Sequence, residues 1–208
     1  MLRTVLIAED HPICVQALTF AIHSLDSAVD VVCVDTLAAA ERRVRAGGLS
    51  AVLLDLGLKD SNGLPNLTLL RSLDSSVPIL VVSANDSPNV IMQAKSLGAN
   101  GFLSKSAPIS EMKQAIAKVL EGECYFVGLE ELRADDKQSP KLPLQLLSPA
   151  QTRVMIALSR GHSNKVIAHE LSLSETTIKT HLSAIYKVLG VTNRSQAILA
   201  LKTAEADG

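Results

Sequence analysis

Aromatic side chains are scarce in this chain. They make up 2% of its 208 residues, and tryptophan is absent. The core must therefore be aliphatic, and too few rings are present for a platform that stacks on the bases of single-stranded nucleic acid. The cysteines, Cys14, Cys33 and Cys124, are odd in number and lack metal-ligand spacing, which argues against both a disulfide framework and a zinc site.

Long hydrophobic runs are also lacking. The apolar run at 77–82 is far too short to span a bilayer, and the first residues lead into a strand-like segment without the architecture of a signal peptide. The few cysteines suit a reducing compartment. We therefore expect a cytoplasmic protein with no membrane partner.

Neither sign of charge is in excess over the whole chain, because 20 basic residues face 21 acidic ones and the formal net charge is -1. The two ends differ, however. Residues 1–125 hold 10 basic and 13 acidic side chains, whereas residues 147–208 hold 7 basic and 4 acidic ones. Only the C-terminal part is therefore suited to bind a polyanion.

Up to about residue 121, short apolar runs alternate with amphipathic segments. The runs resemble buried parallel strands, and prolines stand in the first turn of several intervening segments, where helices begin. The pattern predicts an α/β fold with a doubly wound, five-stranded parallel sheet, whose functional crevice lies at the carboxyl ends of the strands. Strands are expected near 5–8, 29–34, 51–55, 78–83 and 101–103, and helices near 12–24, 36–46, 64–73, 88–97 and 108–121.

The rest of the chain has a different pattern. Periodicity fades in a polar, proline-bearing stretch, and a capping box at Ser148 to Gln151 then starts a helical region. Four helices are expected there, at about 149–160, 164–171, 175–189 and 194–203. We predict an α/β domain over 1–121, a linker over 122–146 and a small all-α domain over 147–208.

Acidic residues follow two strands of the predicted sheet. Glu9 and Asp10 end the first strand and Asp55 ends the third, so parallel pairing brings three carboxylates to one edge. A hard cation such as Mg²⁺ relieves their repulsion and also binds phosphoryl oxygens. Ser83 and Lys105 end or follow two further strands and suit a phosphoryl group. In-line attack by the Asp55 carboxylate on an incoming phosphoryl group would give an aspartyl phosphate.

Two other interpretations exist for these acids. Single acids after strands are often loop-start or helix-cap residues, but their joint placement with Ser83 and Lys105 is harder to explain by chance. A stand-alone phosphatase with Asp55 as nucleophile is the other. It would lack the second aspartate that many such enzymes use as acid and base, because Gly57 stands at that position.

The N-terminal motifs closely resemble the receiver domain of bacterial two-component response regulators. The resemblance implies that Asp55 accepts phosphate from a histidine kinase. It implies a Mg²⁺ site made by Asp10, Asp55 and the Gly57 carbonyl, with Glu9 acting through water. The motifs that carry it are Glu9-Asp10, Asp55-Leu56, Gly63-Leu64, Ser83-Ala84 and Phe102-Leu103-Ser104-Lys105.

The same resemblance implies that Lys105 and Ser83 hold the phosphoryl oxygens, and that Ser83 and Phe102 form a conformational switch. One position departs from the family, which often has proline where Lys59 stands. Lys59 therefore leaves open a regulator whose receiver-like half acts without phosphate. His11 is interpreted as a polar helix-start residue near the crevice.

A helix-turn-helix is expected in the C-terminal domain. Ile178, Leu182, Ile185 and Leu189 form one apolar stripe on the helix predicted at 175–189, and the opposite face is small, polar and basic. Such a face suits a DNA major groove. From spacing alone, an ordinary helical bundle is an equal alternative.

The sequence of this region closely resembles the LuxR-type helix-turn-helix domain. Together with the receiver-like region, it makes the chain resemble response regulators of the NarL/FixJ class. The motifs include Gly161 to Ala168, Leu171 to Glu175, Thr177 to Leu182 and Leu189 to Arg194. The resemblance implies a transcription regulator rather than an enzyme. It also implies that the regulator binds double-stranded DNA as a homodimer when phosphorylated. Base contacts are then assigned to Lys179, Thr180 and Ser183, and mainly phosphate contacts to Asn164, Lys165, Thr176, Thr177 and Lys187.

The last predicted helix resembles the dimerisation helix of that family, although its apolar residues could equally close the bundle. Thr180 and Ser183 are smaller or less basic than the residues the family often has there, which weakens any assignment of a target sequence. His169 and His181 lack a Cys or carboxylate to complete a metal site, so they are interpreted as helix-surface and motif residues.

Overall fold

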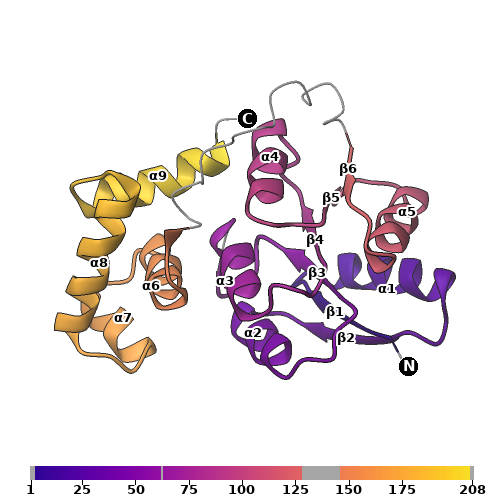
Figure 1. Ribbon diagram of the computed structural model, residues 1–208, viewed down its shortest axis with the longest axis horizontal. Helices are drawn as coiled ribbons and strands as arrows, with labels where there is room; N and C mark the ends of the chain where they lie inside the picture. The colour runs from indigo at the N-terminus through magenta and orange to yellow at the C-terminus, as the bar shows by residue number, and fades with distance from the viewer. Residues whose placement is uncertain (1–2, 62, 128–145, 207–208) are drawn as a thin grey trace.

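The computed structural model of the chain describes residues 3–61, 63–127 and 146–206. They form an α/β part and a helical part that lie side by side (Figure 1). The predicted linker at 122–146 falls mostly outside these ranges. Within them, no helix combines the length and hydropathy needed to cross a bilayer.

The α/β part is built on one parallel sheet with the strand order β2-β1-β3-β4-β5-β6. The predicted doubly wound parallel sheet is confirmed, but the expected number of five strands is wrong, because a sixth pairs with β5. It has two residues, too few to show alternation in the sequence. The strands are Thr4–Ala8 (β1), Asp30–Val34 (β2), Ala51–Asp55 (β3), Ile79–Ser83 (β4), Gly101–Ser104 (β5) and Tyr125–Phe126 (β6).

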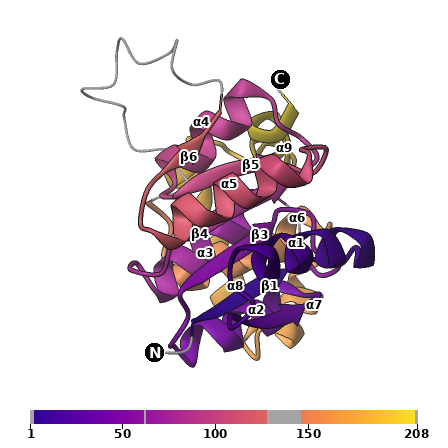
Figure 2. The same cartoon turned by 90° about the vertical axis from the view of Figure 1, so that its right-hand side faces the viewer.

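Helices cover both faces of the sheet (Figure 2). Successive strand residues point to opposite faces, so Val5 and Ile7 pack with α1 and α5, whereas Leu6 and Ala8 pack with α2, α3 and α4. Both faces are thus buried mainly by aliphatic side chains, with one buried aromatic residue on each, Phe102 and Tyr125. These helices are Pro12–Leu25 (α1), Leu37–Arg45 (α2), Pro65–Leu73 (α3), Pro88–Ser96 (α4) and Ile109–Leu120 (α5).

The helical part begins at the predicted capping box. The Ser148 hydroxyl accepts from the Gln151 amide, and the Gln151 side chain accepts from the Ser148 amide. A tight turn joins the second and third helices, and Ser172 there has a positive φ of 53°. The helices are Pro149–Ser159 (α6), Asn164–Glu170 (α7), Glu175–Leu189 (α8) and Arg194–Ala206 (α9).

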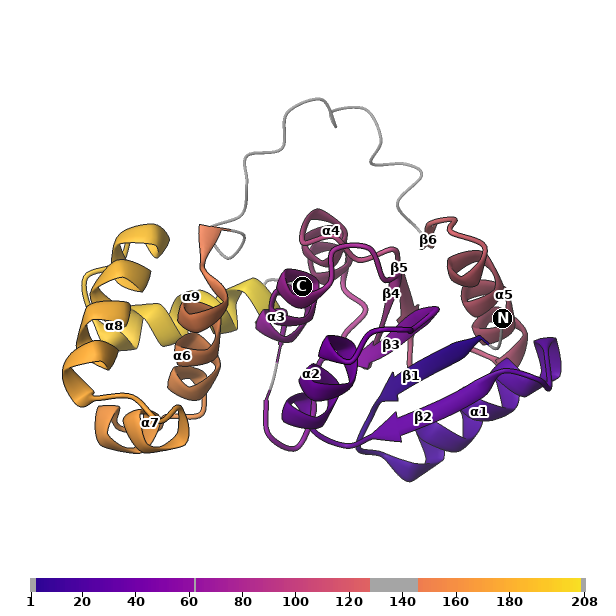
Figure 3. The same cartoon turned by 60° about the horizontal axis from the view of Figure 1, so that its bottom comes forward.

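The two parts are in contact along one side of the sheet. Helix α6 packs against α3, and α9 contacts α4. Helix α8 lies on the far side of α6 from the sheet (Figures 1 and 3). Apolar residues of both parts join in one hydrophobic cluster. The α/β part therefore holds the helical part through α6 and α9.

Gly101 lets β6 approach the sheet. A Cβ at this position would lie 2.9 Å from both Leu80 Cδ1 and the Tyr125 carbonyl oxygen. We expect Gly101→Ala to lower the free energy of unfolding by about 1–3 kcal/mol, because the backbone of β6 must shift. Urea denaturation followed by circular dichroism measures this. Gly122→Ala, with open space around the added Cβ but a positive φ of 82°, is the control and should cost only about 1 kcal/mol.

Candidate functional site

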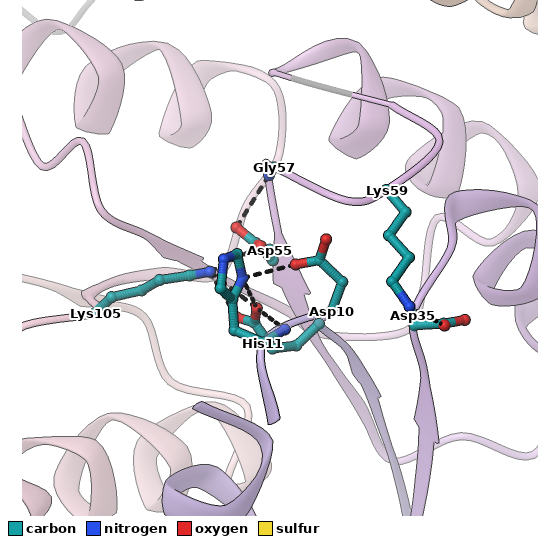
Figure 4. A network of polar contacts seen from close by, with 8 residues as sticks. Asp10, His11, Asp35, Asp55, Gly57, Lys59 and Lys105 are labelled. Carbon is teal, nitrogen blue, oxygen red and sulfur yellow. Dashed lines mark hydrogen bonds and ion pairs between the residues drawn. The ribbon is translucent and has the colours of Figure 1, made fainter. Parts of the chain in front are cut away.

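Three carboxylates meet at the carboxyl edge of the sheet (Figure 4). Glu9 and Asp10 follow β1, and Asp55 is the last residue of β3. One ligand atom from each of Glu9, Asp10, His11 and Asp55 lies within 4.8 Å of the others. Parallel pairing of β1 with β3 produces this convergence, as the sequence predicts.

Lys105 offsets part of this negative charge. Its Nζ lies 2.8 Å from Asp55 Oδ2 and 2.8 Å from Glu9 Oε2, and both acids are only 3% exposed. Burial lowers the pKa of the Lys105 ammonium, but its hydrogen bonds to Asp55 and Glu9 outweigh burial and raise that pKa above its usual value. The lysine is therefore a fixed cation at neutral pH.

His11 contributes more to this cluster than the sequence indicated. It precedes α1, as expected, but its Nδ1 lies 2.9 Å from Glu9 Oε1 and 2.7 Å from Asp10 Oδ1. The ring is 64% exposed, so it covers the cluster on the solvent side. The position next to Asp10 was the available signal, but a local pattern does not fix the direction of a side chain.

Ser83 and Phe102 lie close to the same edge. Asp55 pairs with Val82 in the sheet, so Ser83 stands one residue further toward the carboxyl edge. The Ser83 hydroxyl accepts from the Asn85 amide at 3.2 Å, and the Ser83 carbonyl accepts from the Lys105 amide. Phe102 is 4% exposed and packs in the core beneath. Both residues of the expected switch are thus buried.

The loop after Asp55 is held from several sides. The Gly57 amide donates to Asp55 Oδ1 at 3.0 Å, and the buried Asn66 side chain donates to the Leu56 carbonyl at 2.9 Å. Lys59 turns away from the acids and binds Asp35 Oδ2 at 2.6 Å (Figure 4). Its ammonium is therefore paired with Asp35 rather than with a carboxylate of the acidic cluster, and a receiver that acts without phosphate stays the alternative prediction.

The second group of candidate residues lies on α7 and α8. Ile178, Leu182 and Ile185 are buried, as the stripe predicts. Thr180 donates to the Thr176 carbonyl at 3.1 Å and Ser183 donates to the Lys179 carbonyl at 3.0 Å, so both hydroxyls bond within the helix. The residues with exposed side chains are Lys165, Thr176, Lys179, Thr180, Ser183 and Lys187, whereas Asn164 and Thr177 are half-buried.

Neither His169 nor His181 belongs to a cluster of possible metal ligands among the described residues. His169 is exposed and His181 is half-buried. Helix α8 presents an open polar face that the α/β part does not cover.

Two family models match the chain. One, described as a response regulator receiver domain, matches residues 5–117, and the other, described as bacterial regulatory proteins of the luxR family, matches residues 145–201. A glycerol metabolism activator of Pseudomonas putida is 36% identical over 94% of this chain and 93% of its own length. A transcriptional regulatory protein named NarL from Mycobacterium tuberculosis is 30% identical over 93% of this chain and 91% of its own.

The chain is a response regulator of the NarL/FixJ class. It has a receiver domain and a LuxR-type DNA-binding domain, consistent with regulation of transcription. Because the family consists of transcriptional regulators rather than enzymes, the stand-alone phosphatase is no longer a candidate.

Solved structures agree with the fold. The signal receiver domain of NarL from Mycobacterium tuberculosis, 30% identical, superposes with a TM-score of 0.52 over 59% of this chain and 98% of its own. A structure of RcsB dimers bound to DNA has a TM-score of 0.57 over 98% of this chain and 99% of its own. Because the two sequences are only 20% identical, this structural likeness supports the fold alone.

The acidic cluster of this response regulator fits a hard divalent cation. Glu9 Oε2 and Asp10 Oδ1 are buried and accept no hydrogen bond, although nitrogens of Lys105 and His11 lie near them as ion-pair partners. Carboxylate oxygens with unused lone pairs are the ligands that Mg²⁺ prefers. The residues of the site thus suit the cation that receiver domains bind.

Repulsion within this cluster is a cost to the folded state when no divalent cation is present. We expect Asp10→Asn to raise the free energy of unfolding by about 1 kcal/mol in EDTA, because one of three crowded charges is removed. Added Mg²⁺ should narrow the difference in free energy of unfolding between the two proteins, because it stabilises the folded state of the unsubstituted protein and not that of the variant. Urea denaturation measures both effects. Asp35→Asn, in an exposed pair with Lys59, should change stability by less than about 0.5 kcal/mol, and a destabilised Asp10→Asn protein would contradict the prediction.

Proposed function

We propose that this response regulator accepts a phosphoryl group on Asp55 from a histidine kinase, and that phosphorylation controls dimerisation and sequence-specific binding to double-stranded DNA. The contact of Lys105 with Asp55, within the cluster of Glu9 and Asp10, is the observation that carries this proposal. The regulator acts in the cytoplasm, where its DNA lies. The kinase and the homodimer are partners that the proposal adds.

Phosphoryl transfer follows from the position of the acceptor. The Asp55 carboxylate attacks phosphorus in line with the phosphohistidine of the kinase, so that a P–O bond forms while the P–N bond breaks and its electron pair leaves with the imidazole. Lys105 exchanges a carboxylate oxygen for a phosphoryl oxygen. Ser83, one residue beyond the sheet partner of Asp55, donates its hydroxyl to another.

A divalent cation supports this transfer. Asp10, Asp55 and the Gly57 carbonyl would hold Mg²⁺, with Glu9 acting through water, and the ion would supply positive charge for the phosphoryl oxygens. The chain's own residues orient the acceptor: the Gly57 amide fixes Asp55 Oδ1 and Lys105 fixes Oδ2.

Output begins at the buried pair beneath the site. Ser83 moves toward the phosphoryl group, and Phe102 repacks in the space beside it. Both are almost fully enclosed, at 6% and 4% exposure, so a change at one must be taken up by the packing around the other. We place the receiver at 1–121, the linker at 122–146 and the DNA-binding domain at 147–208.

DNA binding is assigned to the exposed face of α8. Lys179, Thr180 and Ser183 read base edges, while phosphate contacts from neighbouring residues fix the register. Dimers provide two half-sites, and α9 is the dimerisation helix. The phosphate-contacting residues are Asn164, Lys165, Thr176, Thr177 and Lys187. The relative named as an activator of glycerol metabolism makes activation the first direction to test.

Phosphorylation is tested with acetyl phosphate and Mg²⁺. The intact mass of the protein should rise by one phosphoryl group, Asp55→Asn should show no gain, and Asp10→Asn should react at least about tenfold more slowly because the cation is held less well. EDTA should abolish the reaction. The control Asp35→Asn should react as the native protein does. A full mass gain in Asp55→Asn would overturn the proposal.

Two lysine substitutions test which residues contact DNA bases and which contact phosphates. Lys179→Ala should lose about 1–3 kcal/mol of discrimination between a selected duplex and a scrambled one. Lys165→Ala should weaken binding to both duplexes alike and reduce the salt slope by about one. Fluorescence anisotropy over a range of salt concentrations measures both. Equal, sequence-independent losses in the two variants would refute the assignment.

A further inference from the structure

We propose that α2 transmits phosphorylation of Asp55 to the contact between the two domains, with Asp60 as its input and Glu41 as its output. This inference rests on the proposed phosphorylation of Asp55. It adds a route through α2 to the one through Ser83 and Phe102, and Phe102 lies on the same side of the sheet, which faces the DNA-binding domain.

The input end begins at the acceptor itself. Asp55 Oδ1 holds the Gly57 amide, so esterification of the carboxylate changes the charge and the geometry that position this loop. The loop is packed rather than free, because Leu58 and Ser61 are each 5% exposed. A shift at Gly57 must therefore move Asp60, three residues further on, or disrupt buried contacts.

Asp60 fastens the loop to the first turn of α2. Its Oδ1 accepts from the Leu37 amide at 2.6 Å, and its Oδ2 accepts from the Ala38 amide at 3.0 Å. A carboxylate suits the positive end of a helix and satisfies amides that have no partner within it. Next to it, Lys59 ties the same loop to Asp35, just before α2. The acceptor loop and the start of α2 thus form one unit.

The output end lies one turn along the helix. Glu41 accepts from Arg153 of α6, with Arg153 Nε 3.4 Å from Glu41 Oε2, and it also accepts from Arg45 Nη2 at 3.0 Å. Burial raises the pKa of the Glu41 carboxyl, but the hydrogen bonds from Arg153 and Arg45 outweigh it and hold that pKa below its usual value. Glu41 and Arg153 are only 19% and 28% exposed, so this pair is screened less than a surface pair.

Loss of this contact would not uncover α8, because its polar face is already exposed. It would instead free α6 from α3 and allow α9 to leave α4. Since the contact with α4 occupies part of α9 in the docked arrangement, release makes that part of the helix available to a second copy. The device thus controls domain freedom rather than access to the DNA-reading face.

The test uses the full chain with beryllofluoride and Mg²⁺ as the phosphoryl mimic. Fluorine NMR reports whether beryllofluoride is bound, and small-angle X-ray scattering reports the fraction of molecules with separated domains. A protein that binds no beryllofluoride contradicts the proposed function. One that binds it without domain separation contradicts only the α2 route. The two failures are therefore distinguishable.

Asp60→Asn should bind beryllofluoride, but the fraction of molecules with separated domains should rise much less than in the unsubstituted protein. The reason is that the carboxylate that holds the first turn of α2 is lost. Asp30→Asn, an exposed aspartate at the start of β2, is the charge-matched control and should respond fully. A full response in Asp60→Asn with bound beryllofluoride would overturn the route.

Glu41→Gln and Arg153→Gln should each raise the equilibrium constant for domain separation about tenfold without beryllofluoride, which is the effect of one charge-assisted hydrogen bond. The double variant should separate no further than either single one. Arg42→Gln, an exposed neighbour on α2, is the control and should stay docked. Additive effects, or single variants that match Arg42→Gln, would overturn the assignment.

Discussion

Repulsion among carboxylates at one edge of the sheet is the constraint on which the receiver depends. Glu9, Asp10 and Asp55 are brought together by strand pairing, and Lys105 is the cation that the fold supplies among them. The folded chain alone cannot fully offset these charges. A divalent cation would offset the remaining charge, and a phosphoryl group on Asp55 would add negative charge to it, so under the proposed function the site changes when either one binds.

The position of the DNA-binding domain gives that switch something to act on. Helix α6 rests on α3, α9 contacts α4, and an ion pair joins α6 to α2. All three receiver helices lie on the same face of the sheet, opposite α1 and α5. A small preference between docked and separated arrangements, of a few kcal/mol, is enough to shift the population. The α8 face stays exposed in the docked form.

Much of this architecture could be predicted from the sequence because its signals are local. Apolar runs placed the strands, and strand ends placed Asp10, Asp55 and Lys105 at one edge. Strand β6 was missed because two residues carry no periodicity, and pairing with β5 decides their structure. Family motifs, rather than spacing, distinguished the DNA-binding domain from an ordinary bundle. The assigned roles of individual site residues remain predictions.

Side-chain pairs that are far apart in sequence escaped prediction altogether. Asp60 meets α2 across 22 or 23 positions, and Glu41 meets Arg153 across 112. The sequence pattern around Asp60 or Glu41 does not predict a partner, because each acid stands in a setting that is typical of an ordinary surface charge. Lys59 was noticed only as a departure from the family, and its contact with Asp35 became apparent from the structure.

Strand β6 also affects how receivers can meet. A parallel sheet that stopped at β5 would leave a row of unpaired amide and carbonyl groups on that side, which is a template for a strand from another molecule. The pairing of Tyr125 and Phe126 with Gly101 and Phe102 occupies half of that row. Edge-to-edge pairing with another molecule is thus limited to the other half of β5 and to the two residues of β6, which is too short an edge to be a strong template.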